Sequence, residues 1–150
     1  MSKGRGEEIF SKTFRKENED TRLRPKVLVV DDDLLIVTKL TDLLVANGYR
    51  VVTARDGKAG LAQVQAEKPD LVILDIAMPE MDGYEVAYQL RQDPALRRIP
   101  IIVLTAKTGP DVREKTLRSG ADTYMIKPVN NPLLLAQIRS LLVGRGPQSS

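Results

Sequence analysis

Carboxylate side chains directly follow two short apolar runs of this sequence. Asp31 and Asp32 come after the run VLVV, and Asp75 comes after the run LVIL. If both runs are parallel strands, they end at the same edge of a sheet, where neighbouring carboxylates repel one another unless a cation compensates. Magnesium prefers hard oxygen ligands and keeps part of its water shell. The spacing therefore predicts a magnesium site at Asp31, Asp32 and Asp75.

Two further polar side chains stand at the ends of expected strands. Thr105 follows the run IIVL, and Lys127 follows the run TYMI. During phosphoryl transfer, charge on the moving group is stabilised mainly by positioned cations and hydrogen-bond donors. Asp75 as nucleophile, with the Lys127 ammonium and the Thr105 hydroxyl on the phosphoryl oxygens, meets this requirement. The set predicts phosphoryl transfer to Asp75.

Each of these residues also has a purely structural explanation. An acidic pair can form a solvated turn, a threonine can simply end a strand, and a lysine before a proline can open any loop. Asp33 precedes an expected helix and is predicted to cap it rather than to bind metal. Asp82 and Gly83 are interpreted as the turn before another helix. A site is indicated only by the joint placement at strand ends of Asp31, Asp32, Asp75, Thr105 and Lys127.

The composition excludes several kinds of site. The 150 residues contain no cysteine and no histidine, which removes disulfides, thiolate nucleophiles, Ser-His-Asp triads and the usual zinc sites. No apolar run reaches the roughly 18 residues needed to span a bilayer, and the first residues are charged rather than apolar. We therefore expect a cytoplasmic protein without a membrane span.

The basic character of the chain is concentrated near its start. Residues 1–25 carry seven Lys/Arg and five Asp/Glu, which leaves 16 and 15 for the remainder. The chain has no tryptophan, two phenylalanines and four tyrosines, so no basic stripe is interleaved with aromatic side chains. Direct nucleic-acid binding is not expected.

Alternation of apolar runs with helix-period segments predicts a parallel sheet covered on both faces. Five strands are expected at 26–30, 49–54, 71–74, 101–104 and 123–126, with helices between them. The apolar faces of the first and last helices are expected to consist of Ile36, Leu40, Leu43, Leu44, Leu134, Ile138, Leu141 and Leu142. The fold class is a doubly wound α/β domain.

The helix expected at 111–119 is largely charged. Only Val112 and Leu117 are predicted to face the core, so this helix should be the least firmly packed. Residues 1–25 are interpreted as a flexible extension, residues 26–143 as the domain and residues 144–150 as a flexible tail, with Gly144 ending the last helix.

Residues 26–143 resemble the receiver domain of two-component response regulators. The motifs that carry the resemblance are VLVVDDD, LVILDIAMPEMDGYE, IIVLTAKT and SGADTYMIKPV, in that order along the domain. The resemblance implies a flavodoxin-like sheet of strand order 2-1-3-4-5 with five helices. It further implies Mg²⁺ as cofactor and a sensor histidine kinase or a histidine phosphotransferase as partner.

The resemblance also assigns roles to individual residues. It implies phosphorylation of Asp75 and adds the Ala77 backbone carbonyl to the magnesium ligands. Ala106 joins Thr105 and Lys127 around the phosphoryl group. Other implied features are Tyr124 as the switch aromatic and a cis peptide bond between Lys127 and Pro128.

The implied output is binding of a downstream protein, or of a second copy, at the face formed by the fourth helix, the fifth strand and the fifth helix. Such a domain catalyses its own phosphorylation and dephosphorylation without being a turnover enzyme. An aspartyl-phosphate phosphatase is an alternative, but its pattern requires a second aspartate where this sequence has Ala77. The chain is expected to be a stand-alone receiver or a fragment of a longer regulator.

Overall fold

The structure is a computed structural model and describes residues 23–145. Most of the predicted N-terminal extension and the end of the predicted C-terminal tail therefore lie outside the described residues. Within residues 23–145, no helix is both long enough and apolar enough to cross a bilayer.

A five-stranded parallel sheet forms the centre of the domain, with strand order β2-β1-β3-β4-β5. The strands are β1 (Lys26–Val30), β2 (Arg50–Ala54), β3 (Leu71–Asp75), β4 (Ile101–Thr105) and β5 (Thr123–Ile126). The predicted strands and their order are confirmed. Asp75 and Thr105 are the last residues of β3 and β4 rather than the first residues beyond them.

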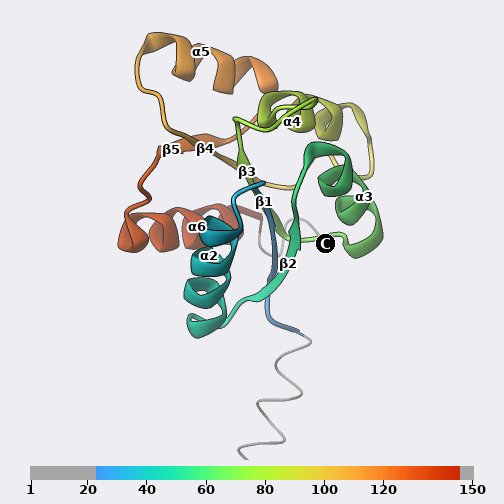
Figure 1. The fold of residues 1–150 in the computed structure, drawn as a ribbon. Coiled ribbons are helices and arrows are strands. Elements are labelled where there is room, and N and C mark those ends of the chain that lie inside the picture. Colours follow the sequence, from blue (N-terminus) through green and yellow to red (C-terminus); the bar gives the residue numbers. More distant parts are fainter. Residues whose placement is uncertain (1–22, 146–150) are drawn as a thin grey trace, which may run out of the picture.

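Five helices alternate with and follow these strands in the described part of the chain. They are α2 (Leu34–Ala46), α3 (Gly57–Glu67), α4 (Gly83–Gln92), α5 (Pro110–Ser119) and α6 (Asn131–Arg145). Figure 1 shows α2 and α6 on one face of the sheet, and α3, α4 and α5 on the other. Helix α6 continues through Gly144, so this glycine does not end it.

Two apolar layers separate the helices from the sheet. Successive residues of a strand point to opposite faces, so Val27 and Val29 pack under α2 and α6 while Leu28 and Val30 pack under α3 and α4. Helix α2 buries Val37, Leu40 and Leu44, with Ile36 and Leu43 half-buried beside them. Helix α6 buries Leu134 and Ile138, with Leu141 and Leu142 half-buried.

The prediction that Leu117 of α5 faces the core is wrong. Leu117 is 70% exposed, and α5 buries Val112, Thr116 and Ser119 instead. The Thr116 hydroxyl donates to the Val112 carbonyl at 2.7 Å, and the Ser119 hydroxyl donates to the Thr116 carbonyl at 2.7 Å. The Ser119 hydroxyl also accepts from the Ala121 amide at 3.3 Å, so local hydrogen bonds allow these polar side chains to be buried. Helix α5 thus has even less apolar anchoring than the sequence predicted.

Arg91, near the end of α4, connects several segments of the chain. Its guanidinium donates to the carbonyls of Gly120 and Ile99, both at 2.7 Å, and to that of Arg97 at 2.9 Å. It also forms an ion pair with Asp122 at 3.0 Å. The C-terminal end of α5 is therefore fixed to α4 and to the start of β4.

Candidate functional site

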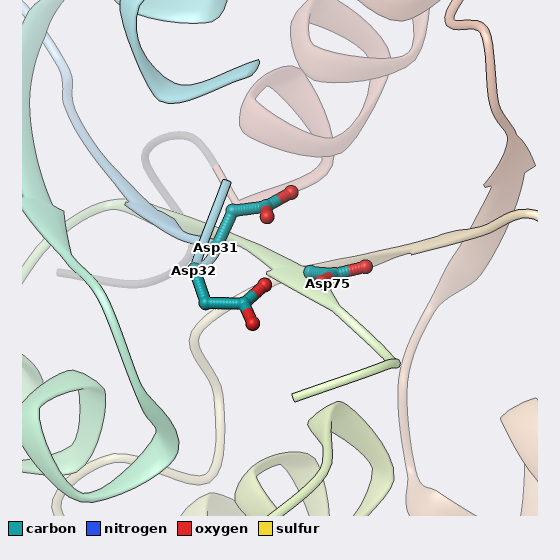
Figure 2. A group of neighbouring side chains, drawn as sticks. All are labelled: Asp31, Asp32 and Asp75. Atoms are coloured by element: carbon teal, nitrogen blue, oxygen red, sulfur yellow. The ribbon is translucent and has the colours of Figure 1, made fainter. Parts of the chain in front are cut away.

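The three carboxylates predicted to bind metal lie together at the C-terminal ends of β1 and β3. These strands are neighbours, with Val30 opposite Leu74, so the residues that follow emerge side by side. One oxygen from each of Asp31, Asp32 and Asp75 lies within 4.8 Å of the other two. Figure 2 shows all three side chains gathered at this edge of the sheet. Asp31 and Asp75 are buried, whereas Asp32 is exposed.

Lys127, in the loop after β5, lies against the two buried carboxylates. Its Nζ atom donates to Asp75 Oδ1 at 2.8 Å and to Asp31 Oδ2 at 3.1 Å. The peptide bond between Lys127 and Pro128 is cis, as the resemblance implied. The backbone amide of Lys127 donates to the Thr105 carbonyl at 2.7 Å, which couples this loop to the end of β4.

The electrostatics of the cluster favour an additional cation. Burial raises the pKa of Asp31, and the charge of Asp75 raises it further, against the opposing effects of the Asp33 amide and of Lys127. Burial alone would lower the pKa of Lys127, but its hydrogen bonds to Asp75 and Asp31 outweigh burial and raise it. The Lys127 ammonium thus contacts two carboxylates of a cluster that contains three.

The residues present fit a hard divalent cation. They offer carboxylate oxygens only, and two of the three carboxylates are buried, where neighbouring negative charges repel unless a cation compensates. Ala77, the fourth predicted ligand, lies exposed in the loop after β3. The described residues therefore contain an acidic cluster that could bind a metal ion.

The loop that carries Ala77 is packed tightly against the end of β3. The Ile76 carbonyl accepts from the amides of Met78 at 3.0 Å and Gly83 at 3.1 Å. A Cβ atom at position 83 would collide with the Asp75 carbonyl, so only glycine fits there. The sequence pattern indicates a turn at this position but not the close approach of Gly83 to the Asp75 carbonyl. A glycine directly after the helix-capping Asp82 was the available signal.

Thr105 lies on the other side of Asp75, at the end of β4. The Thr105 side chain is buried, and its Oγ1 accepts from the Lys107 amide at 3.0 Å. Beside it is a hollow of about 440 Å³, lined by the β3–α4 loop, the exposed Ala106 and the start of α5. This hollow leaves space for the segment after β4 to rearrange.

Tyr124 is in the middle of β5, with β4 between it and the strand of Asp75. Its side chain is half-buried and lines a second hollow with Arg113 and Leu117 of α5. Asp33 caps α2, accepting from the Leu35 amide at 2.9 Å, which confirms its predicted role as a helix cap.

Comparison with known proteins gives the family of this chain. The family model of the response regulator receiver domain matches residues 27–139. The chain belongs to this family. A receiver domain of two-component signal transduction is a phosphoacceptor, which confirms the function class predicted from the sequence.

Individual relatives agree with this assignment. The chain is 41% identical to response regulator PleD of Caulobacter vibrioides over 116 residues, covering 77% of the chain and 26% of PleD. It is 42% identical over 120 residues to the alkaline phosphatase synthesis transcriptional regulatory protein PhoP of Bacillus subtilis, covering 80% and 49%. The receiver domain thus spans about a quarter to a half of these relatives.

Solved structures share the fold across almost their whole length. The chemotaxis protein CheY4 of Vibrio cholerae superimposes with a TM-score of 0.75 at 34% identity, covering 79% of this chain and 98% of CheY4. The receiver domain of a signal transduction histidine kinase from Syntrophus aciditrophicus gives a TM-score of 0.77 at 33% identity, covering 82% and 93%.

Proposed function

We propose that this receiver domain accepts a phosphoryl group on Asp75 with Mg²⁺ held by Asp31, Asp32, Asp75 and the Ala77 carbonyl. The observation that supports this most strongly is the placement of Asp75 itself. It is buried within an acidic cluster that spans at most 4.8 Å between ligand atoms, and it accepts a 2.8 Å hydrogen bond from Lys127.

The donor we propose is the phosphohistidine of a sensor histidine kinase or a histidine phosphotransferase. A carboxylate oxygen of Asp75 attacks the phosphorus while the phosphorus–nitrogen bond breaks. The imidazole leaves with the bonding electrons and takes a proton from solvent, and an acyl phosphate forms on Asp75. When bound, Mg²⁺ neutralises charge on the acceptor and on the phosphoryl oxygens.

Residues beside Asp75 would then hold the phosphoryl group. The Lys127 ammonium already contacts Asp75 Oδ1 and can extend to the added oxygens. The Thr105 hydroxyl, which now accepts from the Lys107 amide, can turn to donate to the phosphoryl group. The Ala106 amide adds a third donor. Turning of Thr105 would free the Lys107 amide and loosen the segment before α5.

The output we propose is a change of the face formed by α5, β5 and α6, including Arg113, Lys115, Tyr124 and Gln137. Thr105 and the start of α5 border the same hollow, so movement at Thr105 can reach the helix. Tyr124 would turn inward as Thr105 moves. Helix α5 begins after Gly109 without a side-chain cap and has few apolar anchors, so shifting its N-terminal part costs little even though Arg91 fixes its C-terminal end. A downstream protein or a second copy would bind the changed face.

In this proposal the domain acts as a switch and not as a turnover enzyme. It would act in the cytoplasm and would not contact nucleic acid directly. The alternative of an aspartyl-phosphate phosphatase is less consistent with the site, since Ala77 supplies no acid-base group.

Phosphoramidate, a small-molecule phosphodonor, tests the proposal. Intact mass spectrometry should show one added phosphoryl group with Mg²⁺ present and none with EDTA. Labelling that is unaffected by EDTA would contradict the metal role.

A further inference from the structure

Gly57, the first residue of α3, touches the loop between β3 and α4. A Cβ atom at position 57 would lie 2.8 Å from the Met81 carbonyl oxygen and 2.9 Å from both Met81 Cβ and Met81 Cγ. The Met81 carbonyl oxygen belongs to the backbone, so it can move only if the loop moves with it. Gly57 does not have the positive φ that favours glycine. The lack of room for a side chain, rather than the backbone conformation, therefore requires glycine at position 57.

The loop that Met81 belongs to is held in a strained conformation. Glu80 has a φ of 67°, which non-glycine residues rarely adopt. The Met81 amide donates to the Pro79 carbonyl at 2.7 Å, and the half-buried Met81 side chain packs against the apolar core. Such a conformation persists only where the surroundings fix it. The contact with Gly57 is one of those constraints.

The same loop carries Ala77. As a proposed metal ligand, Ala77 would act through its backbone carbonyl, which cannot rotate by itself as a carboxylate side chain can. Its position depends on the path of the whole loop. Groups that orient a metal ligand without touching the metal affect its affinity strongly.

We propose that Gly57 is a positioning residue for the metal site: by admitting Met81 against the start of α3, it sets the position of the Ala77 carbonyl. This inference rests on the magnesium site of the proposed function. Gly57 itself does not touch the metal, and its effect passes through Met81 and the loop.

A merely structural role of Gly57 makes a different prediction. In that case Gly57→Ala would lower stability and leave metal affinity unchanged. Gly60 provides a matched control, because it is a buried glycine of the same helix. A Cβ atom there would lie 3.0 and 3.1 Å from the Val30 methyl groups, in the sheet and not in the loop.

Isothermal titration with Mg²⁺ separates the two roles. Gly57→Ala should raise the magnesium dissociation constant by about tenfold. Gly60→Ala should destabilise the fold and leave the constant within about twofold of the native value, since it spares the loop. At saturating Mg²⁺, the rate of phosphoramidate labelling of Gly57→Ala should recover to near the native rate, because Asp75 and Lys127 are intact.

Native affinity in Gly57→Ala, or equal weakening in Gly60→Ala, would overturn the inference. If Gly57→Ala does not fold, Met81→Ala replaces it; that variant loses the loop's anchor in the core and should also bind Mg²⁺ more weakly, and native affinity there would likewise overturn the inference. Absence of magnesium binding by the native protein would instead contradict the proposed function.

Discussion

The Nζ atom of Lys127 lies 2.8 Å from Oδ1 of Asp75, although the two residues are 52 positions apart in the sequence. The same ammonium reaches Asp31 at 3.1 Å. Lys127 is thus the cation that the described structure places between two buried carboxylates at the ends of neighbouring strands.

Replacing Lys127 by alanine should preserve the fold but weaken it. In EDTA we expect a loss of about 2 kcal/mol in the free energy of unfolding, because two buried carboxylates lose their shared cation. Mg²⁺ should restore part of this loss by supplying positive charge. Phosphorylation should no longer change the α5–β5–α6 face. Urea unfolding with Mg²⁺ and with EDTA measures the first effects, with Lys115→Ala on the surface of α5 as control. An unfolded variant, or one that keeps the full phosphorylation response, would disprove the coupling role of Lys127.

Replacing Asp31 by asparagine should stabilise the metal-free protein. Burial raises the pKa of Asp31, so its ionised form costs free energy at neutral pH. Asparagine keeps an acceptor for the Asp33 amide, which now donates to Asp31 Oδ1 at 2.9 Å. We expect a gain of about 1 kcal/mol in EDTA, and a smaller stabilisation by Mg²⁺ than in the native protein. Chemical denaturation in both conditions measures this. A less stable variant in EDTA would mean that the hydrogen bonds of Asp31 outweigh its burial.

Replacing Arg91 by alanine should lower stability by about 3 kcal/mol, since three carbonyls, two of them in part-buried hydrogen bonds, lose their donor together. The carbonyls concerned are those of Gly120, Arg97 and Ile99, and Asp122 loses its ion pair. Arg98→Ala, which alters an exposed arginine of the same region, should have little effect. Thermal unfolding compares the variants. Equal stability of the two would show that Arg91 does not fix the end of α5.

Beryllofluoride with Mg²⁺, a mimic of the phosphoryl group, should change amide hydrogen exchange most between Lys107 and Tyr124. This window contains the segment that Thr105 releases and the weakly anchored helix α5. Asp75→Asn is the control and should show no response. Changes confined to α2 and β2 would contradict the proposed output face, because these elements lie on the other side of the domain.

The strands and the strand-end residues could be predicted because buried parallel strands are apolar runs, and the first polar residue marks the functional edge. Asp75 at the end of the fully buried β3 follows this rule directly, whereas Lys127 follows the partly buried β5. The carboxylate cluster followed from neighbouring strands in the sheet, whose order came from the family resemblance.

Other features depend on contacts that no local pattern contains. The prediction for Leu117 is wrong because the buried face of α5 is partly polar. The Thr116 and Ser119 hydroxyls donate to carbonyls of the helix itself, so these residues can be buried in place of Leu117. The contact of Gly57 with Met81 joins the start of α3 to the loop between β3 and α4, and the glycine has no turn conformation to reveal it. The sequence does not distinguish Arg91 from other basic residues in the last turn of a helix, so its contacts could not be predicted.

The position of the phosphoryl group tests the central claim most directly. After labelling with phosphoramidate and Mg²⁺, borohydride reduces the acyl phosphate and marks the modified aspartate, which tandem mass spectrometry of the peptides then identifies. We predict one modified residue, Asp75, and no modification of Asp75→Asn. Modification of Asp31 or Asp32 instead, or unchanged labelling of Asp75→Asn, would contradict the assignment of Asp75 as the acceptor.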